Sequence, residues 1–92
     1  MSVTVQIPTP LRRFTDEQAV VTVEGGTVGE ALASLVDKHR ALEPHLFADG
    51  KLRSFVNVFL GDEDVRFLQR DRTPLSAGDR LSIIPSIAGG AP

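Results

Sequence analysis

Two adjacent glycines, Gly89 and Gly90, stand near the end of the chain, after an apolar segment that contains Pro85. Glycine has no Cβ, so a Gly-Gly pair lets a main chain pass through a narrow channel and lie close to the catalytic groups of another protein. The chemistry open to such a tail is that of a main-chain carboxylate. ATP could convert the carboxylate into an acyl-adenylate, whose carbonyl carbon is open to attack by a sulfur or nitrogen nucleophile. With sulfur, the product is a thiocarboxylate.

The tail has to project from a folded domain before another protein can reach it. Pro85 has no N–H to donate to a strand ladder, so regular pairing is expected to weaken there. The segment from Pro85 to Gly90 could then reach about 17 Å. We therefore expect a domain over residues 1–86 and a flexible tail over residues 87–92. A solvated terminal linker without function would show the same two glycines.

The composition is that of one small globular domain. The 92 residues are 41% hydrophobic and 24% charged, with a net charge of −2 and no cysteine. Such a chain has no overall positive field to gather nucleic acid or an anionic membrane. It contains no secretory signal pattern and no apolar run of the ~20 residues that a membrane span needs, which predicts a cytoplasmic protein. The lack of cysteine excludes disulfides and a cysteine nucleophile.

The chain alternates between strand and helix signals. Apolar residues alternate over 3–7 and 19–23, which predicts a hairpin with a long connection. Thr27 and Glu30 have the capping-box spacing, and a helical apolar stripe follows, although Gly29 in the first turn disfavours a helix. Residues 41–53 are expected to be irregular. Strands are predicted at 54–60, 65–68 and 81–87. A helix between such strands gives a two-layer α+β domain, and a last strand parallel to the first makes it a β-grasp, the ubiquitin-like roll.

Three further groups of residues invite a binding hypothesis. His39 and His45 have no recognised metal-ligand spacing, and no metal site is expected. The acidic turn over 62–64 is either solvated or a docking point for a partner. On the strand at 54–60, alternation places Phe55 and Phe59 on the outer sheet face, opposite Val56, Val58 and Leu60. That face is a possible partner surface, and its predicted members are Phe55, Phe59, Arg66 and Phe67.

Several segments resemble the CysO branch of the MoaD/ThiS family of ubiquitin-like sulfur carriers. They are "VTVQIPTPLRRFT", "GGTVGEAL", "NVFLGDEDVRFL" and "GDRLSIIPSIAGG", and they span nearly the whole chain. The resemblance implies a β-grasp carrier that is not an enzyme and binds no cofactor. By this resemblance, Gly90 carries the adenylate or thiocarboxylate, Gly89 provides the narrow passage, and Ile87 and Ala88 lie in the channels of partner proteins.

The same resemblance implies a set of partners. A MoeZ-type adenylating enzyme, often fused to a rhodanese, would use ATP to activate Gly90 and install sulfur. A PLP-dependent cysteine synthase, or another sulfur-accepting synthase, would receive that sulfur. In the cysteine pathway, a JAMM-type zinc protease would release the product. The catalytic residues belong to these partner proteins, and the resemblance implies no catalytic residue in this chain.

The chain departs from the family pattern after Gly90, because Ala91 and Pro92 hold its carboxyl group in a peptide bond. A removable precursor extension, cut by a JAMM-type protease, explains this best. A cloning remnant and loss of the carrier function are the alternatives. Two other functions also stay open: the small subunit of a molybdopterin-synthase-type complex, and a ubiquitin-like protein modifier. A plain interaction module with an idle tail is a further alternative.

Overall fold

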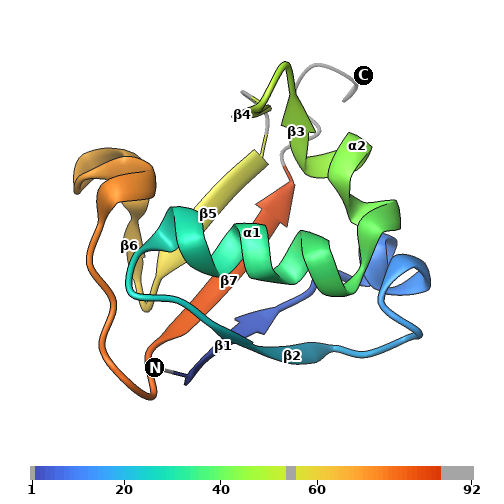
Figure 1. Cartoon of the computed structure of the whole chain (residues 1–92), viewed down its shortest axis with the longest axis horizontal. Helices are drawn as coiled ribbons and strands as arrows, with labels where there is room; N and C mark the ends of the chain where they lie inside the picture. Colours follow the sequence, from blue (N-terminus) through green and yellow to red (C-terminus); the bar gives the residue numbers. More distant parts are fainter. Residues whose placement is uncertain (1, 54–55, 86–92) are drawn as a thin grey trace.

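A five-stranded mixed sheet forms the frame of the computed structural model, which describes residues 2–53 and 56–85 (Figure 1). The strand order is β2-β1-β7-β5-β6, and β1 pairs antiparallel with β2 and parallel with β7. The last strand therefore returns beside the first, which confirms the predicted β-grasp. The strands of this sheet are β1 (Ser2–Gln6), β2 (Val20–Glu24), β5 (Val56–Leu60), β6 (Glu63–Asp64) and β7 (Arg80–Pro85).

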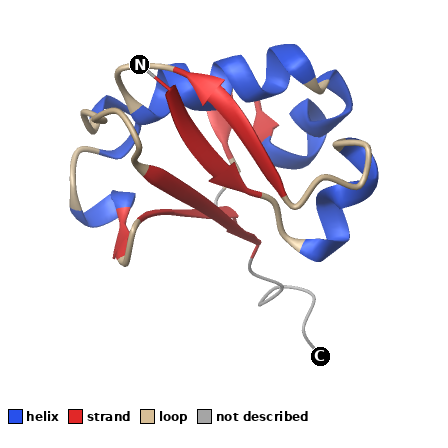
Figure 2. Ribbon diagram, turned by 90° about the horizontal axis from the view of Figure 1, so that it is seen from below, coloured by secondary structure: helices blue, strands red, loops and turns tan. Residues whose placement is uncertain are grey.

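One helix, α1 (Val28–Lys38), crosses one face of the sheet (Figures 1 and 2). Two side-chain hydrogen bonds cap its first turn. The Thr27 Oγ1 accepts the backbone N–H of Glu30 at 3.2 Å, and the Glu30 Oε1 accepts the N–H of Gly26 at 2.8 Å. The predicted capping box is thus present, with Glu30 reaching one residue further back than the usual pattern.

The core lies between α1 and the inner face of the sheet. Alternate residues of the strands are buried there, as the period of two requires. Leu32 and Leu35 of α1 lie over them, and Leu60, at the end of β5, is partly buried against this cluster. The buried strand residues are Val3, Val5, Val21, Val23, Val56, Val58, Leu81 and Ile83.

Two glycines let backbone segments approach α1 closely. A Cβ on Gly25 would lie 2.6 Å from the backbone nitrogen of Ala31, closer than real Cβ atoms come. A Cβ on Gly29 would lie 3.1 Å from the carbonyl oxygen of Asp71. Gly29, which lowers helix propensity, therefore has a packing reason for its place in the first turn of α1.

The segment predicted to be irregular contains short regular elements instead. Asp49 and Gly50 have φ angles of +54° and +77°, and this turn joins two strands of two residues each. Strands so short carry no readable periodicity, although the Asp-Gly pair is a hairpin signal. The elements of this segment are η2 (Arg40–Leu42), α2 (Glu43–Leu46), β3 (Phe47–Ala48) and β4 (Lys51–Leu52).

The strand predicted over 65–68 is wrong. The strand pairing with β5 ends at Asp64, and a 3-10 helix, η3 (Val65–Phe67), follows. The cause is local, since the Asp64 side chain accepts the backbone N–H of Arg66 at 2.9 Å and so caps the helix. Two further 3-10 helices are η1 (Thr9–Phe14) and η4 (Arg70–Arg72).

Candidate functional site

The strand that leads toward the two C-terminal glycines is held on both sides. β7 pairs with β1 over Arg80–Ser82 and with β5 over Leu81–Pro85, and the last partner pair is Val56 with Pro85. A tail that follows β7 therefore starts from a central strand of the sheet. The residues predicted to carry the chemistry or to be removed lie outside the described residues, as does the proposed domain boundary. They are Ile87, Ala88, Gly89, Gly90, Ala91 and Pro92.

A shallow groove of about 380 Å³ lies beside the end of β7. Val20 of β2 and Ile84 of β7 line it, and their exposed fractions of 48% and 47% mark them as apolar side chains facing solvent. The Arg12 Nε donates to the carbonyl of Ile7 at 3.0 Å along the same groove, which ties η1 to the end of β1. The groove thus places exposed apolar surface beside the end of β7.

Neither of these exposed apolar residues was predicted from the sequence to bind a partner. A signal for them was present, because Val20-Val21 and Ile83-Ile84 are adjacent apolar pairs within strands. Neighbouring strand residues point to opposite faces, so one member of each pair had to face outward.

The predicted partner surface is brought together in part. Asn57 and Phe59 of β5 alternate with the buried Val56 and Val58, so both lie on the outer face of the sheet. The guanidinium of Arg66 reaches that face and donates to the Asn57 side chain. Phe55 lies outside the described residues.

Phe67 is highly exposed among the described members of this predicted surface. It belongs to η3, next to Arg66, and its side chain is 86% exposed. The side chain of Leu68, which follows it, is 36% exposed. Large exposed apolar side chains of this kind are common anchors in protein interfaces.

His45 and the end of the acidic turn make contacts within the domain. The His45 ring stacks on Phe14, with ring centroids 4.2 Å apart, and so joins α2 to η1. Asp64, at the end of the acidic turn, caps η3 and pairs with Arg66 at 3.1 Å. Among residues 2–53 and 56–85, no three His, Asp or Glu side chains are grouped closely enough to hold a metal ion. None of the helices described could cross a membrane.

Comparison with known proteins decides the family. The model of the ThiS family matches residues 5–90 of this chain. The chain belongs to the ThiS family. The sulfur carrier protein CysO of Mycobacterium tuberculosis is 40% identical over 93 residues, which cover 98% of this chain and all of the relative. This ThiS-family chain is therefore CysO-like, as its sequence segments indicated.

Solved structures of relatives share the fold. CysO in the crystal structure of the Amycolatopsis orientalis BexX/CysO complex matches with a TM-score of 0.87 and 40% identity, covering 96% of this chain and 99% of that one. The small archaeal modifier protein SAMP1 of Haloferax volcanii matches with a TM-score of 0.84 and 31% identity, covering 98% and 100%. Sulfur carriers and protein modifiers thus share the architecture of this ThiS-family member.

Proposed function

We propose that this protein is a sulfur carrier that delivers sulfur as a thiocarboxylate on Gly90, for the biosynthesis of cysteine or another sulfur-containing metabolite. The observation that carries the proposal is that the family match ends at Gly90. Ala91 and Pro92 fall beyond it, as expected of residues that are removed before the carrier works. The CysO relatives, which match 98% of this chain over their whole length, support the same role.

The chemistry follows from the poor reactivity of a carboxylate. An activating partner transfers AMP from ATP to the freed Gly90 carboxylate and releases pyrophosphate. A sulfur nucleophile then attacks the acyl-adenylate and displaces AMP. The carrier supplies only the acyl group, so it acts as a co-substrate and not as an enzyme. The nucleotide is used by the partner and is no cofactor of this chain.

Three classes of partner complete the proposed cycle. A JAMM-type zinc protease removes Ala91 and Pro92. A MoeZ-type adenylating and rhodanese enzyme activates Gly90 and adds sulfur. A PLP-dependent cysteine synthase, or another sulfur-accepting synthase, receives it. The Amycolatopsis orientalis CysO was crystallised in a complex with BexX, which supports docking of such carriers on a partner protein.

The outer face of the sheet is the surface that we assign to these partners. A partner that draws the tail into its active site must also contact the surface around the end of β7. Val20 and Ile84 offer exposed apolar area there, and Phe59 and Arg66 extend the same face along β5. Apolar patches rimmed by polar groups are typical of protein interfaces.

Intact mass spectrometry tests the proposal. The chain ending at Gly90 is incubated with ATP, a sulfur donor and the activating enzyme of its own organism, and the mass of one oxygen-to-sulfur exchange is expected. A thiol-reactive alkylating reagent should then label the C-terminal residue. The chain that ends in Gly90→Pro is the matched control. An unchanged mass of the trimmed chain, with an activating enzyme that modifies another carrier, would contradict the proposal.

A ubiquitin-like modifier is the second candidate. Two likenesses to SAMP1, the small archaeal modifier protein 1 of Haloferax volcanii, favour it. One is the shared fold, and the other is 39% sequence identity over 72 residues. Both functions begin with the same adenylate, and they differ in the nucleophile that attacks it. Adducts between Gly90 and lysine side chains of other proteins, detected by mass spectrometry in cells, would support the modifier.

A further inference from the structure

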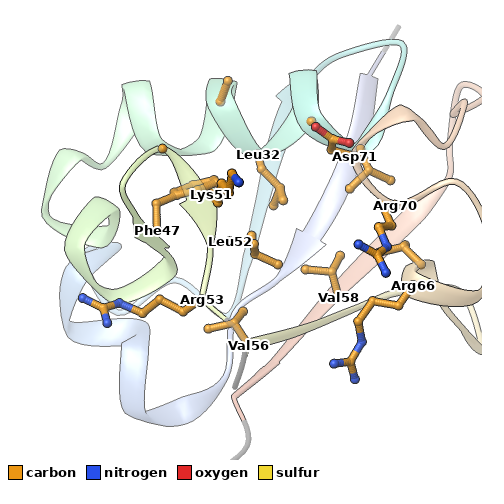
Figure 3. Close-up of a pocket in the computed structure, with 15 residues that line it drawn as sticks. Leu32, Phe47, Lys51, Leu52, Arg53, Val56, Val58, Arg66, Arg70 and Asp71 are labelled. Atoms are coloured by element: carbon orange, nitrogen blue, oxygen red, sulfur yellow. The ribbon is translucent and has the colours of Figure 1, made fainter.

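A second cavity lies on the helix side of the sheet, away from the groove beside β7. Its volume is about 750 Å³, and α1, β4, β5 and the two helices η3 and η4 surround it (Figure 3). The side chains of its lining come from parts of the chain that are far apart in sequence. The tail chemistry does not use it, and of its lining residues Arg66 also belongs to the outer-face partner surface.

The middle of this cavity is apolar. Leu32 of α1, Leu52 of β4 and Val58 of β5 point toward one another across it (Figure 3). Leu32 and Val58 are buried, with exposed fractions of 3% and 1%, and form the floor, whereas the partly buried Leu52 supplies accessible apolar surface. An apolar side chain of a bound molecule that covers this surface would be stabilised by the removal of apolar area from water.

The rim of the cavity is positively charged, although the whole chain has a net charge of −2. Four cationic side chains line the cavity against one carboxylate, that of Asp71. Lys51 and Arg70 lie on opposite sides of the apolar centre (Figure 3). The other two cations are Arg53, which donates to the carbonyl of Pro44 at 2.8 Å, and Arg66, which pairs with Asp64.

Arg70 is held in an unusual backbone conformation. Its φ angle is +54°, in the left-handed region that residues other than glycine rarely adopt. The neighbouring Asp71 packs against Gly29, which has no Cβ to keep η4 away from α1. Strained residues gather at binding sites, where the surrounding structure holds them in place. Here the strained residue is one that faces the cavity across from Lys51.

We propose that this cavity docks an extended acidic segment of a partner protein, with an apolar side chain of that segment seated against Leu52, above the buried Leu32 and Val58. The charges indicate a segment and not a compact headgroup, because the two cations nearest the centre, Lys51 and Arg70, lie on opposite sides of it and do not converge on one point. Figure 3 shows the Arg53 and Arg66 guanidinium groups pointing away from the centre, with Lys51 and Arg70 nearer to it. Carboxylates spaced along a peptide match such a spacing.

A peptide titration of the full chain tests this docking site without any sulfur chemistry. The probe is a capped six-residue peptide with two central leucines flanked on each side by two aspartates. We expect saturable shifts in the amide and methyl signals of Gly29, Leu32, Leu52 and Val58 in NMR spectra. Binding should weaken as sodium chloride rises from about 50 mM to about 300 mM, because exposed charges are screened.

Matched variants distinguish binding by the cations at the cavity rim from a general effect of the protein's charge. The double variant Lys51→Gln, Arg70→Gln should raise the dissociation constant about threefold to tenfold. Arg80→Gln, an exposed position on the outer face of β7, should leave it unchanged. Both variants are checked for wild-type thermal melting, and Leu52→Asp offers a second disruption of the site.

Three outcomes would overturn the docking site. One is the absence of shifts at these residues. Another is equal binding of a peptide with asparagines in place of the aspartates. The third is equally tight binding of octanoate at the same residues, which would assign the cavity to a small anionic amphiphile. None of these results bears on whether Gly90 accepts sulfur.

Discussion

The guanidinium of Arg66 lies 3.1 Å from the carboxylate of Asp64, and that carboxylate also accepts the backbone N–H of Arg66 at 2.9 Å. Hydrogen bonds from Arg66 stabilise the ionised form, so they hold the pKa of Asp64 below its usual value. The same guanidinium donates to Asn57 on β5. One side chain therefore joins the cap of η3 to the outer sheet face.

This relationship predicts a pH-dependent contribution to stability. The folded-state pKa of Asp64 is lowered, so its contribution is present above the unfolded-state pKa of about 3.9 and is lost as the pH falls through the folded-state value. Asp64→Asn should therefore lower the urea midpoint at pH 7, and the difference from wild type should close in acid, below about pH 4. Asp62→Asn, in the same turn, is the control. A difference that persists unchanged at low pH would show that the carboxylate charge is not involved.

The close approach at Gly25 predicts a large effect of one methyl group. Gly25→Ala would place a Cβ 2.6 Å from the backbone nitrogen of Ala31, and backbone of a capped helix cannot move away cheaply. We expect a loss of about 1–3 kcal/mol in the free energy of unfolding, measured by urea denaturation.

The neighbouring glycine is the matched control for that change. A Cβ on Gly26 would meet only the end of the Glu30 side chain, at 3.4 Å, so Gly26→Ala should change stability by less than about 1 kcal/mol. Equal losses for both variants would mean that general glycine effects, and not the contact with Ala31, set the cost.

The sequence allowed much of the fold to be predicted because its strong periodic segments are also its structural frame. Alternation at β1, β2 and β5 and the capped stripe of α1 each act over five or more residues. The misses are elements too short for a period. β3 and β4 have two residues each, and the segment after Asp64 became a 3-10 helix through one side-chain cap.

The candidate sites also differ in how far they could be predicted from the sequence. The Gly89-Gly90 tail could be proposed as a site from the sequence because its residues are adjacent, and that site stays a prediction. The cavity between Leu32, Leu52 and Val58 could not, because these residues share no spacing and meet only after the chain has folded. Arg70 carries no sequence signal of its left-handed backbone either.

The groove beside β7 predicts a variant that separates docking from folding. Ile84→Asp places a charge on an exposed apolar position, so the fold should survive because Ile84 contributes little to the core. Activation of the trimmed carrier should fall about tenfold or more in kcat/KM for the activating enzyme, since a buried unpaired charge weakens an interface. Ala77→Asp, in the exposed turn before β7, is the control. An unchanged kcat/KM for Ile84→Asp would remove this groove from the partner surface.

Removal of Ala91 and Pro92 should decide whether the activating enzyme can adenylate the carrier. Adenylation needs a free carboxylate at Gly90, and a peptide bond to Ala91 leaves no oxygen that can attack ATP there. In ATP–pyrophosphate exchange with the activating enzyme, the chain ending at Gly90 should be active and the 92-residue chain inactive until a JAMM-type protease is added. Both chains should melt at the same temperature, because the strands and α1 are unchanged. Equal exchange by the two chains, with Pro92 retained in the mass spectrum of the product, would mean that a carboxylate other than that of Gly90 is activated.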